Sequence, residues 1–194
     1  MVKQKLVLIG GGGHSLSVMD IAEDMPDLEI AGFVDVTADA ELSRFGVGYL
    51  GTDDCIPNLI EAGHTFHIAI GQLVSPEVRQ RSFGVVKGLG APLLTVAAQT
   101  AYISDHSLLG QGVFVGHRAI INAGAQIGAN CILNTGCVVE HGAVIGSHCH
   151  IAPGAIILGN AMIGDGSFVG AGAVIRESVV LDAGTVVSAG EFRK

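Results

Sequence analysis

The 194-residue sequence contains no tryptophan, and only 5% of its residues are aromatic and 14% charged. So few rings exclude a core built around large aromatic side chains and favour one packed from small aliphatic side chains. Ten lysines and arginines stand against eighteen acidic residues, a net charge of −8, and the basic residues form no run. Nucleic acid and anionic membranes are therefore poor partners for this surface.

Two further absences concern location and redox state. No apolar run approaches the length of a membrane span, and glycines interrupt the first ten residues too early for a signal peptide. The four cysteines (Cys55, Cys131, Cys137 and Cys149) include no C-x-x-C pair. We expect a cytoplasmic protein whose cysteines are reduced core residues. A redox pair of Cys131 and Cys149, which are eighteen residues apart, is the alternative.

A repeat of six residues fills the second half of the chain, from Ala101 to Gly190. From Ile103 to Val187, every sixth residue is Ile, Leu or Val, at fifteen consecutive positions. A small residue often lies two positions before each of these aliphatic residues, and Gly or Asn often lies three positions after the aliphatic residue. A hexapeptide period is the signature of a parallel β-helix. Three hexads close one triangular coil, so the sequence predicts about five coils.

The first half of the chain has a different pattern. Residues 5–9 read as a buried strand, four glycines follow at 10–13, and residues 16–25 carry helical spacing. A strand, a glycine turn and a helix in this order can hold an anion on backbone N–H groups. A second strand over 29–34 ends at Asp35, near the offset of a ribose-binding acid. The G-x-G-x-x-G fingerprint of dinucleotide-binding folds is incomplete, because Ser15 stands where its third glycine would be.

The remaining elements of this half are a helix over 53–62, a strand over 66–71 and a helix over 75–87 with Pro76 in its first turn. Together they predict an α/β domain over residues 1–98, a small parallel βαβαβ unit that is half of a Rossmann-like fold. A domain this short suits a mononucleotide better than a dinucleotide. An all-β β-helix domain would then occupy residues 99–194.

Histidines supply the candidate chemistry. Three of the eight, His141, His148 and His150, fall within ten residues of a repeat otherwise dominated by Gly, Ala, Val and Ile. Side-chain alternation turns Glu140 outward and places His141 at a corner, where it could remove a proton near neutral pH. The alternative is an exposed corner histidine without a role. We expect no metal, because these histidines lack the carboxylate and the spacing of a zinc site.

Four segments carry a resemblance to a known family. They are Val-Leu-Ile-Gly-Gly-Gly-Gly-His at 7–14, Ala-Ile-Gly at 69–71, Asn-Thr-Gly-Cys-Val-Val-Glu-His at 134–141 and His-Ile-Ala-Pro-Gly at 150–154. With them the chain resembles, over nearly its whole length, the NeuD/PglD group of bacterial sugar acyltransferases. These include UDP-4-amino-sugar N-acetyltransferases and sialic acid O-acetyltransferases. The resemblance implies a left-handed β-helix that binds acetyl-CoA, an N-terminal domain that binds a nucleotide sugar, and a homotrimer with active sites between neighbouring subunits.

The resemblance also implies roles for individual residues. His141 would be the general base with Glu140 beside it, and His150 would lie beside the acetyl thioester. The pantetheine arm would pass Gly159, Gly170 and Ala171, and the sugar nucleotide would bind at Gly12, Gly13, His14, Asp35 and Gly71. The implied reaction is direct transfer: His141 takes the proton from the sugar amine as it attacks the thioester, and a backbone N–H or His150 stabilises the oxyanion.

Two departures from the family pattern bear on activity. Gly142 stands where the family usually has an acid that raises the basicity of the histidine, and the chain ends in Ala189–Lys194 rather than in a Gly-x-Pro-Ala-Lys segment. Our prediction is an acetyl-CoA-dependent N-acetyltransferase of a UDP-linked 4-amino sugar. The alternatives are an O-acetyltransferase of sialic or other nonulosonic acids, a trimeric sugar-nucleotide-binding protein that has lost catalysis, and a nicotinamide-dependent dehydrogenase.

Overall fold

The computed structural model describes residues 3–73 and 75–194, which form two compact units. One unit contains the chain up to Gly71 together with Glu77–Val96, and the other contains Gln72–Pro76 and Ala97–Lys194. The second unit therefore takes in a short segment from the first half of the chain, which nothing in the sequence indicated. None of the helices described is long and apolar enough to cross a membrane.

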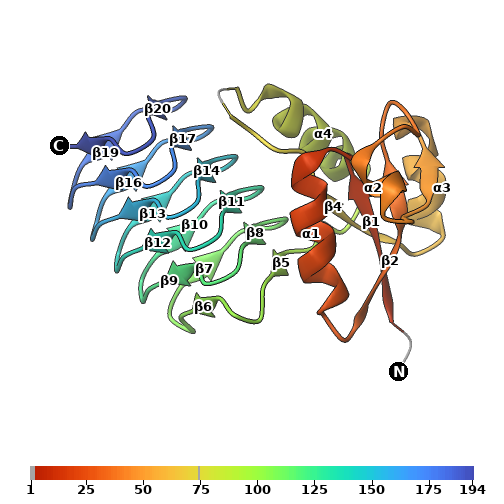
Figure 1. Cartoon of the computed structure of the whole chain (residues 1–194), viewed down its shortest axis with the longest axis horizontal. Coiled ribbons are helices and arrows are strands. Elements are labelled where there is room, and N and C mark those ends of the chain that lie inside the picture. Colours follow the sequence, from red (N-terminus) through yellow and green to blue (C-terminus); the bar gives the residue numbers. More distant parts are fainter. Residues whose placement is uncertain (1–2, 74) are drawn as a thin grey trace. The chain divides into compact units, whose positions relative to one another are not determined.

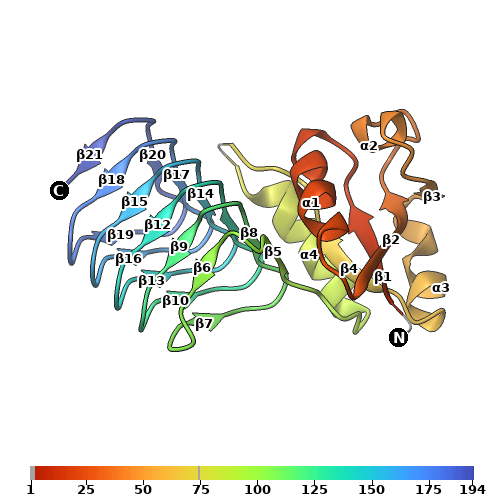
Figure 2. The ribbon, with the colours of Figure 1, turned by 60° about the horizontal axis from the view of Figure 1, so that its bottom comes forward.

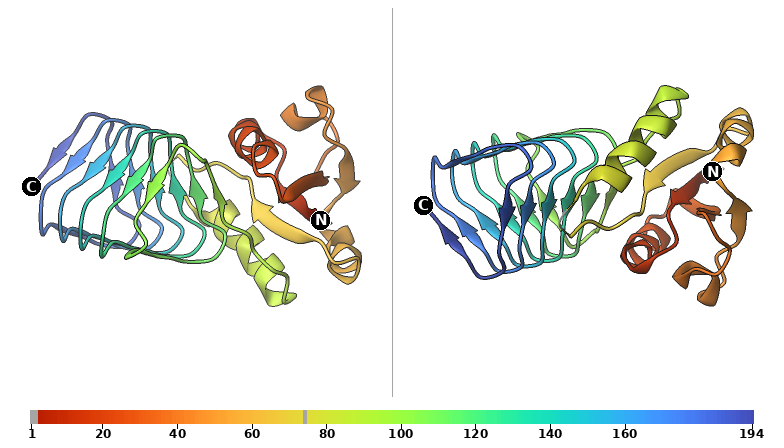
Figure 3. Two further views of the ribbon diagram at one scale, coloured as in Figure 1. Left: turned by 90° about the horizontal axis from the view of Figure 1, so that it is seen from below. Right: turned by 90° about the horizontal axis from the view of Figure 1, so that it is seen from above.

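The first unit is a parallel sheet with helices on both faces. Its elements are β1 (Gln4–Ile9), α1 (Gly13–Glu23), β2 (Leu28–Val34), α2 (Glu41–Arg44), β3 (Tyr49–Gly51), α3 (Ile56–Glu61) after a 3₁₀ turn at Asp53–Cys55, β4 (Thr65–Ile68) and α4 (Glu77–Gly88). The strand order is β3-β2-β1-β4, and every pairing is parallel. Helices α1 and α2 cover one face and α3 and α4 the other (Figure 3). Both faces are covered, and accordingly the last four residues of β1 (Leu6–Ile9) and all four residues of β4 are buried.

The predicted α/β fold of this unit is confirmed, with differences at short elements. Helix α1 begins at Gly13, three residues before the predicted start, because its first turn is formed by the end of the glycine run. The four-residue α2 and the three-residue β3 were not predicted. Neither is long enough to show a hydrophobic period, and their positions are set by packing against β2 and α1.

The second unit is a left-handed parallel β-helix (Figures 1 and 2). Its two-residue strands are β5 (Val96–Ala97), β6 (Tyr102–Ile103), β7 (Leu108–Leu109), β8 (Phe114–Val115), β9 (Ile120–Ile121), β10 (Gln126–Ile127), β11 (Ile132–Leu133), β12 (Val138–Val139), β13 (Val144–Ile145), β14 (His150–Ile151), β15 (Ile156–Ile157), β16 (Met162–Ile163), β17 (Phe168–Val169), β18 (Val174–Ile175), β19 (Val180–Leu181), β20 (Val186–Val187) and β21 (Phe192–Arg193). They form three sheets: β5-β8-β11-β14-β17-β20 (face 1), β6-β9-β12-β15-β18-β21 (face 2) and β7-β10-β13-β16-β19 (face 3).

The hexad register predicted from the sequence is the register of the coils. Each of the fifteen periodic residues is the second residue of a strand, from β6 to β20. Strands pair with those eighteen residues away, as Val138 does with Ile120 and Ile156. From Val115 onward the periodic residues are at most 6% exposed, and burying each such side chain stabilises the fold by about 2 kcal/mol. The core is therefore a ladder of aliphatic side chains along the helix axis.

Small residues fill the rest of this interior. Cys131 and Cys149 are fully buried in adjacent coils, and their thiols donate to the carbonyls of Gly146 (3.0 Å) and Gly164 (3.2 Å). Burial raises the pKa of the Cys137 thiol to about 12. All three positions agree with the expectation of small core residues.

Candidate functional site

The residues assigned to the sugar nucleotide gather at one edge of the first unit. Parallel strands end at the same edge, and backbone hydrogen bonds align these ends: Gly10 N–H donates to Val34 O and Ala69 N–H to Ile9 O, both at 2.8 Å. Strand β1 lies between β2, the next strand in the sequence, and β4, a strand that follows later in the chain. A ligand crevice is expected at such a reversal of strand order, outside the carboxyl ends of the strands.

The glycine turn at this edge has two halves. Gly10 has φ +100°, and a Cβ at Gly11 would press into Phe33, so the first two glycines are required by the backbone and by packing. Gly12 and Gly13 are exposed, and a Cβ on either would meet nothing within 4 Å. Gly12 caps α1 without a side-chain bond. The start of α1 thus presents backbone N–H groups and a positive dipole end to an open space that suits an anion.

Asp35 holds this turn in place. Its Oδ2 accepts the N–H of Gly11 and its Oδ1 accepts the N–H of Val36, both at 2.6 Å. The carboxylate therefore has a structural role at the turn, apart from the ribose contact predicted for it. On the other side of the turn, His14 packs beside Gly71, since a Cβ at Gly71 would lie 3.3 Å from His14 Cβ.

The candidate base lies in the second unit, on the corner between faces 2 and 3. This corner, the His141 corner, consists of residues 104–106, 122–124, 140–142, 158–160 and 176–178 in successive coils. His141 is exposed there, and its ring lies over Gly159, one coil further on. A Cβ at Gly159 would stand 2.7 Å from Cε1 and 2.8 Å from Nε2 of His141. Any side chain at 159 would force the ring to shift from this position.

Glu140 and Gly142 flank His141 in the sequence. Glu140 Oε2 accepts the backbone N–H of His141 at 3.3 Å, and the part of the chain that the structure describes places no acid in ion-pair contact with the imidazole. Gly142 has φ +68°, and a Cβ there would collide with Oδ1 of Asn160. The side chain of Asn160 thus fills, from the next coil, the space that an acid at 142 would enter.

His150 lies elsewhere on the coil. It projects from β14 on face 1, is only 7% exposed, and packs edge-on against Phe168 with ring centroids 5.2 Å apart. Its Nδ1 is 2.5 Å from the Gln72 carbonyl and its Nε2 is 3.2 Å from Asn134 Nδ2. A carbonyl can only accept, so Nδ1 carries the proton and Nε2 accepts from the amide. Gln72 is held a second time, through a bond from its Nε2 to Gly166 O at 3.3 Å.

The coil geometry thus separates some of the predicted site residues. Face 1 lies opposite the corner between faces 2 and 3, so His150 and His141 of one chain are on different sides of the coil. Gly170 and Ala171 follow β17 and belong to the corner between faces 1 and 2. His141, Glu140 and Gly159 are the members that one corner of a single chain brings together.

Comparisons with known proteins agree with both units. The family described as PglD N-terminal domain matches residues 5–85, and the bacterial transferase hexapeptide family (six repeats) matches residues 106–141, 125–159 and 142–177. No curated protein matched the sequence.

Solved structures match nearly the whole chain. PerB from Caulobacter crescentus, in complex with CoA and GDP-perosamine, is 32% identical with a TM-score of 0.88, over 96% of this chain and 86% of that chain. The chain belongs to the NeuD/PglD-type sugar acyltransferases. The acetyltransferase domain of PglB from Neisseria gonorrhoeae FA1090, in complex with acetyl coenzyme A, is 28% identical with a TM-score of 0.89, over 97% and 89%. WeeI from Acinetobacter baumannii AYE, 21% identical over 97% and 95% with a TM-score of 0.70, shares the fold.

The predicted family and enzyme class are therefore confirmed.

The sequence analysis missed two residues that contact predicted site positions of this NeuD/PglD-type protein. Asn160 had a usable signal, because it lies eighteen residues after Gly142 and must stack on it. Gln72 had none, since its contact with His150 joins segments that are 78 residues apart.

Proposed function

We propose that this protein transfers the acetyl group of acetyl-CoA to the amine of a nucleotide-linked amino sugar. The relatives that bind CoA with GDP-perosamine, or acetyl-CoA, support the substrate classes. Within this chain, the observation that carries the proposal is the exposed His141 ring seated on Gly159. An imidazole beside a glycine backbone, which a thioester could approach closely, supports this chemistry. Because acetyl-CoA is made and used in the cytoplasm, we place the protein there.

In the proposed reaction the sugar amine attacks the thioester carbonyl directly. His141 accepts the amine proton as the C–N bond forms, the C–S bond then breaks, and the departing thiolate takes this proton from His141 to leave as the CoA thiol. The N–H of Gly159 makes no hydrogen bond within the described chain. It lies next to the imidazole and is our candidate donor to the oxyanion, a type of contact that lowers such barriers by several kcal/mol. Gly170 and Ala171 remain the predicted pantetheine contacts on the corner between faces 1 and 2.

The nucleotide would bind at the glycine turn of the first unit. Its diphosphate would accept hydrogen bonds from Gly12 and Gly13 at the start of α1, where the dipole favours anions. Asp35 would keep the turn in the binding geometry through its bond to Gly11. His14 and Gly71 border the same edge and would contact the sugar end.

We further propose a homotrimer in which neighbouring subunits share each active site. His150 and His141 lie on different sides of one coil, so a site that uses both histidines needs two chains. Exposed apolar side chains cover the two faces beside the His141 corner: Tyr102, Ile120 and Phe192 on face 2, and Leu108, Met162 and Val180 on face 3. A groove of about 410 Å³ on face 3 runs along β7, β10 and β13. Apolar surfaces of this extent usually meet a partner.

The test is release of free CoA thiol with a panel of UDP- and GDP-linked amino sugars, CMP-linked and free nonulosonic acids, and UDP-N-acetylglucosamine as a blank. We expect turnover on an amino sugar. We also expect loss of at least 100-fold in kcat/KM for His141→Ala, as is usual for removal of a general base. His106→Ala changes an exposed histidine on the same corner in an earlier coil and is the matched control.

Other outcomes would point elsewhere. Turnover on nonulosonic acids alone would assign the protein to O-acetylation. Binding of the nucleotide sugar and of CoA with no thiol release would indicate a protein that has lost catalysis. That second candidate is favoured by one observation: among the described residues, no acid lies in ion-pair contact with the His141 ring. Full activity of His141→Ala would refute the proposed base.

A further inference from the structure

His150 lies in a chain of three hydrogen bonds that runs over face 1 and the corner beside it. The backbone N–H of Thr135 donates to Asn134 Oδ1 at 2.8 Å, Asn134 Nδ2 lies 3.2 Å from His150 Nε2, and His150 Nδ1 lies 2.5 Å from the Gln72 carbonyl. All four residues belong to the second unit. The chain of bonds therefore begins at a backbone N–H and ends at a backbone carbonyl.

These two backbone ends fix the direction of every bond between them. An N–H can only donate, so Oδ1 of Asn134 faces Thr135 and the amide nitrogen faces His150. The amide nitrogen can also only donate, so Nε2 of His150 carries no proton. The carbonyl of Gln72 can only accept, so Nδ1 carries the proton. His150 is therefore held as the neutral Nδ1–H tautomer.

In this tautomer the group that can still donate to a ligand is the amide of Asn134. The one N–H of the His150 ring is used by Gln72. The Asn134 amide has a second N–H, which meets no acceptor in the part of the chain that the structure describes, and Asn134 is only half-buried. The two N–H bonds share one nitrogen and one plane, so the bond to His150 also sets the direction of the second N–H.

Gln72 is itself held across two coils. Its carbonyl accepts from His150 in β14, and its side-chain Nε2 donates to the carbonyl of Gly166 at 3.3 Å. Gly166 precedes β17, the strand that pairs with β14. Gln72 is 3% exposed, and among the described residues its Oε1 has no hydrogen-bond partner. The bond to Gly166 is thus the contact through which the side chain keeps the carbonyl over His150.

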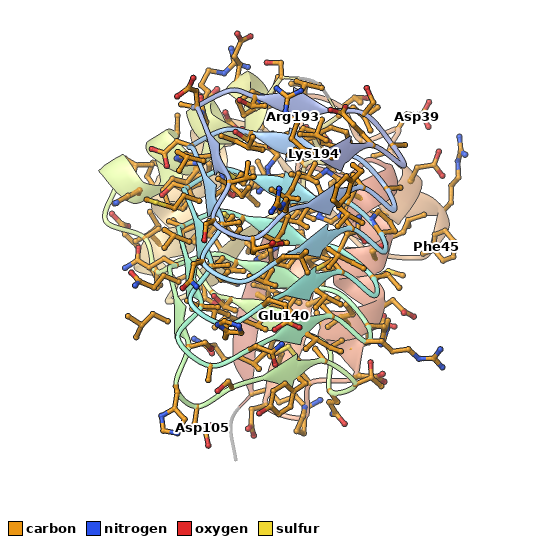
Figure 4. The ribbon with its side chains drawn as sticks, turned by 90° about the vertical axis from the view of Figure 1, so that its left-hand side faces the viewer. Asp39, Phe45, Asp105, Glu140, Arg193 and Lys194 are labelled. Atoms are coloured by element: carbon orange, nitrogen blue, oxygen red, sulfur yellow. The ribbon has the colours of Figure 1, made fainter. Side chains whose placement is uncertain are left out.

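We infer that Gln72 is a positioning residue, which through His150 holds the Asn134 amide so that its second N–H donates to the thioester carbonyl of acetyl-CoA. This inference rests on the proposed function, because it takes the thioester as the reacting group. The N–H would stabilise the oxyanion as the amine attacks, while His150 keeps its proton on Nδ1 throughout. The base lies on the His141 corner, where Figure 4 shows Glu140. In the proposed trimer it would come from the neighbouring subunit.

The first measurement is the tautomer of His150. In protein labelled with ¹⁵N on histidine, two-bond ¹H–¹⁵N correlation spectra distinguish protonated from unprotonated ring nitrogens, and the signal absent from His150→Gln identifies the residue. We expect a protonated Nδ1 and an unprotonated Nε2 at neutral pH. Gln72→Met has a side chain of similar length that cannot bond to Gly166, and it should give a mixture of both tautomers. A protonated Nε2 in the unmodified protein would overturn the inference.

The second measurement is thiol release. Gln72→Met should lower kcat about tenfold, the effect of one misplaced hydrogen bond, and leave both KM values within about twofold. The thermal midpoint should change little, because methionine replaces a buried amide whose Oε1 has no partner among the described residues. Gln111→Met is the matched control, since it changes an exposed glutamine on the corner between faces 3 and 1 and should leave kcat and the spectra unchanged.

Double-mutant cycles test the order of the contacts. Gln72→Met should have almost no further effect in His150→Ala, and His150→Ala almost none in Asn134→Ala. Losses that multiply in the second cycle would mean that His150 acts on the thioester itself, which contradicts the inference.

The spectra also separate this inference from the proposed function. If no acceptor is acetylated but Gln72→Met still changes the tautomer of His150, the positioning by Gln72 stands and the reaction falls. If Gln72→Met leaves the His150 signals unchanged, Gln72 does not position the ring, whatever the protein acetylates.

Discussion

Replacing Gly159 by alanine should damage catalysis through His141 alone. Gly159 does not have a positive φ, so alanine fits the backbone. Its methyl group, however, would stand 2.7 Å from Cε1 of His141. Ordinary contact begins at about 3.4 Å, so the ring would have to move by roughly 0.7 Å. A displacement of that order can cost about 100-fold in rate, and we expect kcat to fall to that extent.

The assay is thiol release in a double-mutant cycle with His141→Ala. If the methyl group acts by moving the imidazole, Gly159→Ala should have almost no effect in the His141→Ala background. The ring is exposed, so the thermal midpoint should change little. The reasoning is refuted if the two losses multiply, or if Gly159→Ala keeps kcat and raises only the KM for acetyl-CoA. The second result would mean that Gly159 admits the pantetheine arm rather than the ring.

Three further predictions concern other residues. Burial lowers the pKa of His67 to about 4, so the unfolded chain binds a proton before the folded protein does. Stability should fall by about 3 kcal/mol as the pH drops from about 6.5 to about 4, and denaturant titrations of His67→Gln should show a flatter pH dependence if this is right. Gly142→Asp combined with Asn160→Gly should move the acidic limb of the kcat/KM profile to higher pH, because a carboxylate beside an imidazole raises its pKa; an unmoved limb would contradict this. Asp35→Asn should raise the KM for the nucleotide sugar about tenfold without changing that for acetyl-CoA, because it removes the charged acceptor of the Gly11 N–H; an unchanged KM for the sugar would show that the turn holds without it.

The β-helix could be predicted almost residue by residue because its period is short and its pairing follows from it. Once Val139 is assigned inward, Ile121 and Ile157 must be its neighbours, since three hexads make one coil. Strands β1, β2 and β4 could also be predicted, because each contains a run of mainly apolar residues. The strand order of the first unit could not be predicted, because β3 is too short to show a pattern. The neighbours of β1 also depend on how the helices pack on the sheet.

The site was predictable in part for the same reason. The stacking of Gly159 on His141 follows from their separation of eighteen residues. The placement of His150 on the face opposite the His141 corner also follows from counting hexads, but the bonds that bury it could not be foreseen. Those bonds involve Gln72, which is brought there by tertiary structure alone. The bond of Asp35 to Gly11 depends on the strand order and was equally hidden.

The stacking of identical coils gives this protein a fixed unit of length along its axis. Removal or insertion of a whole hexad would keep residues such as Ile163 pointing inward, but only steps of eighteen also keep every later residue on the same face. One extra coil between Gly159 and Arg176 would leave the stacking of His141 on Gly159 unchanged and lengthen the distance from His141 to Arg176 by about 4.8 Å. The number of coils therefore sets the distance between His141 and the last coil of the β-helix.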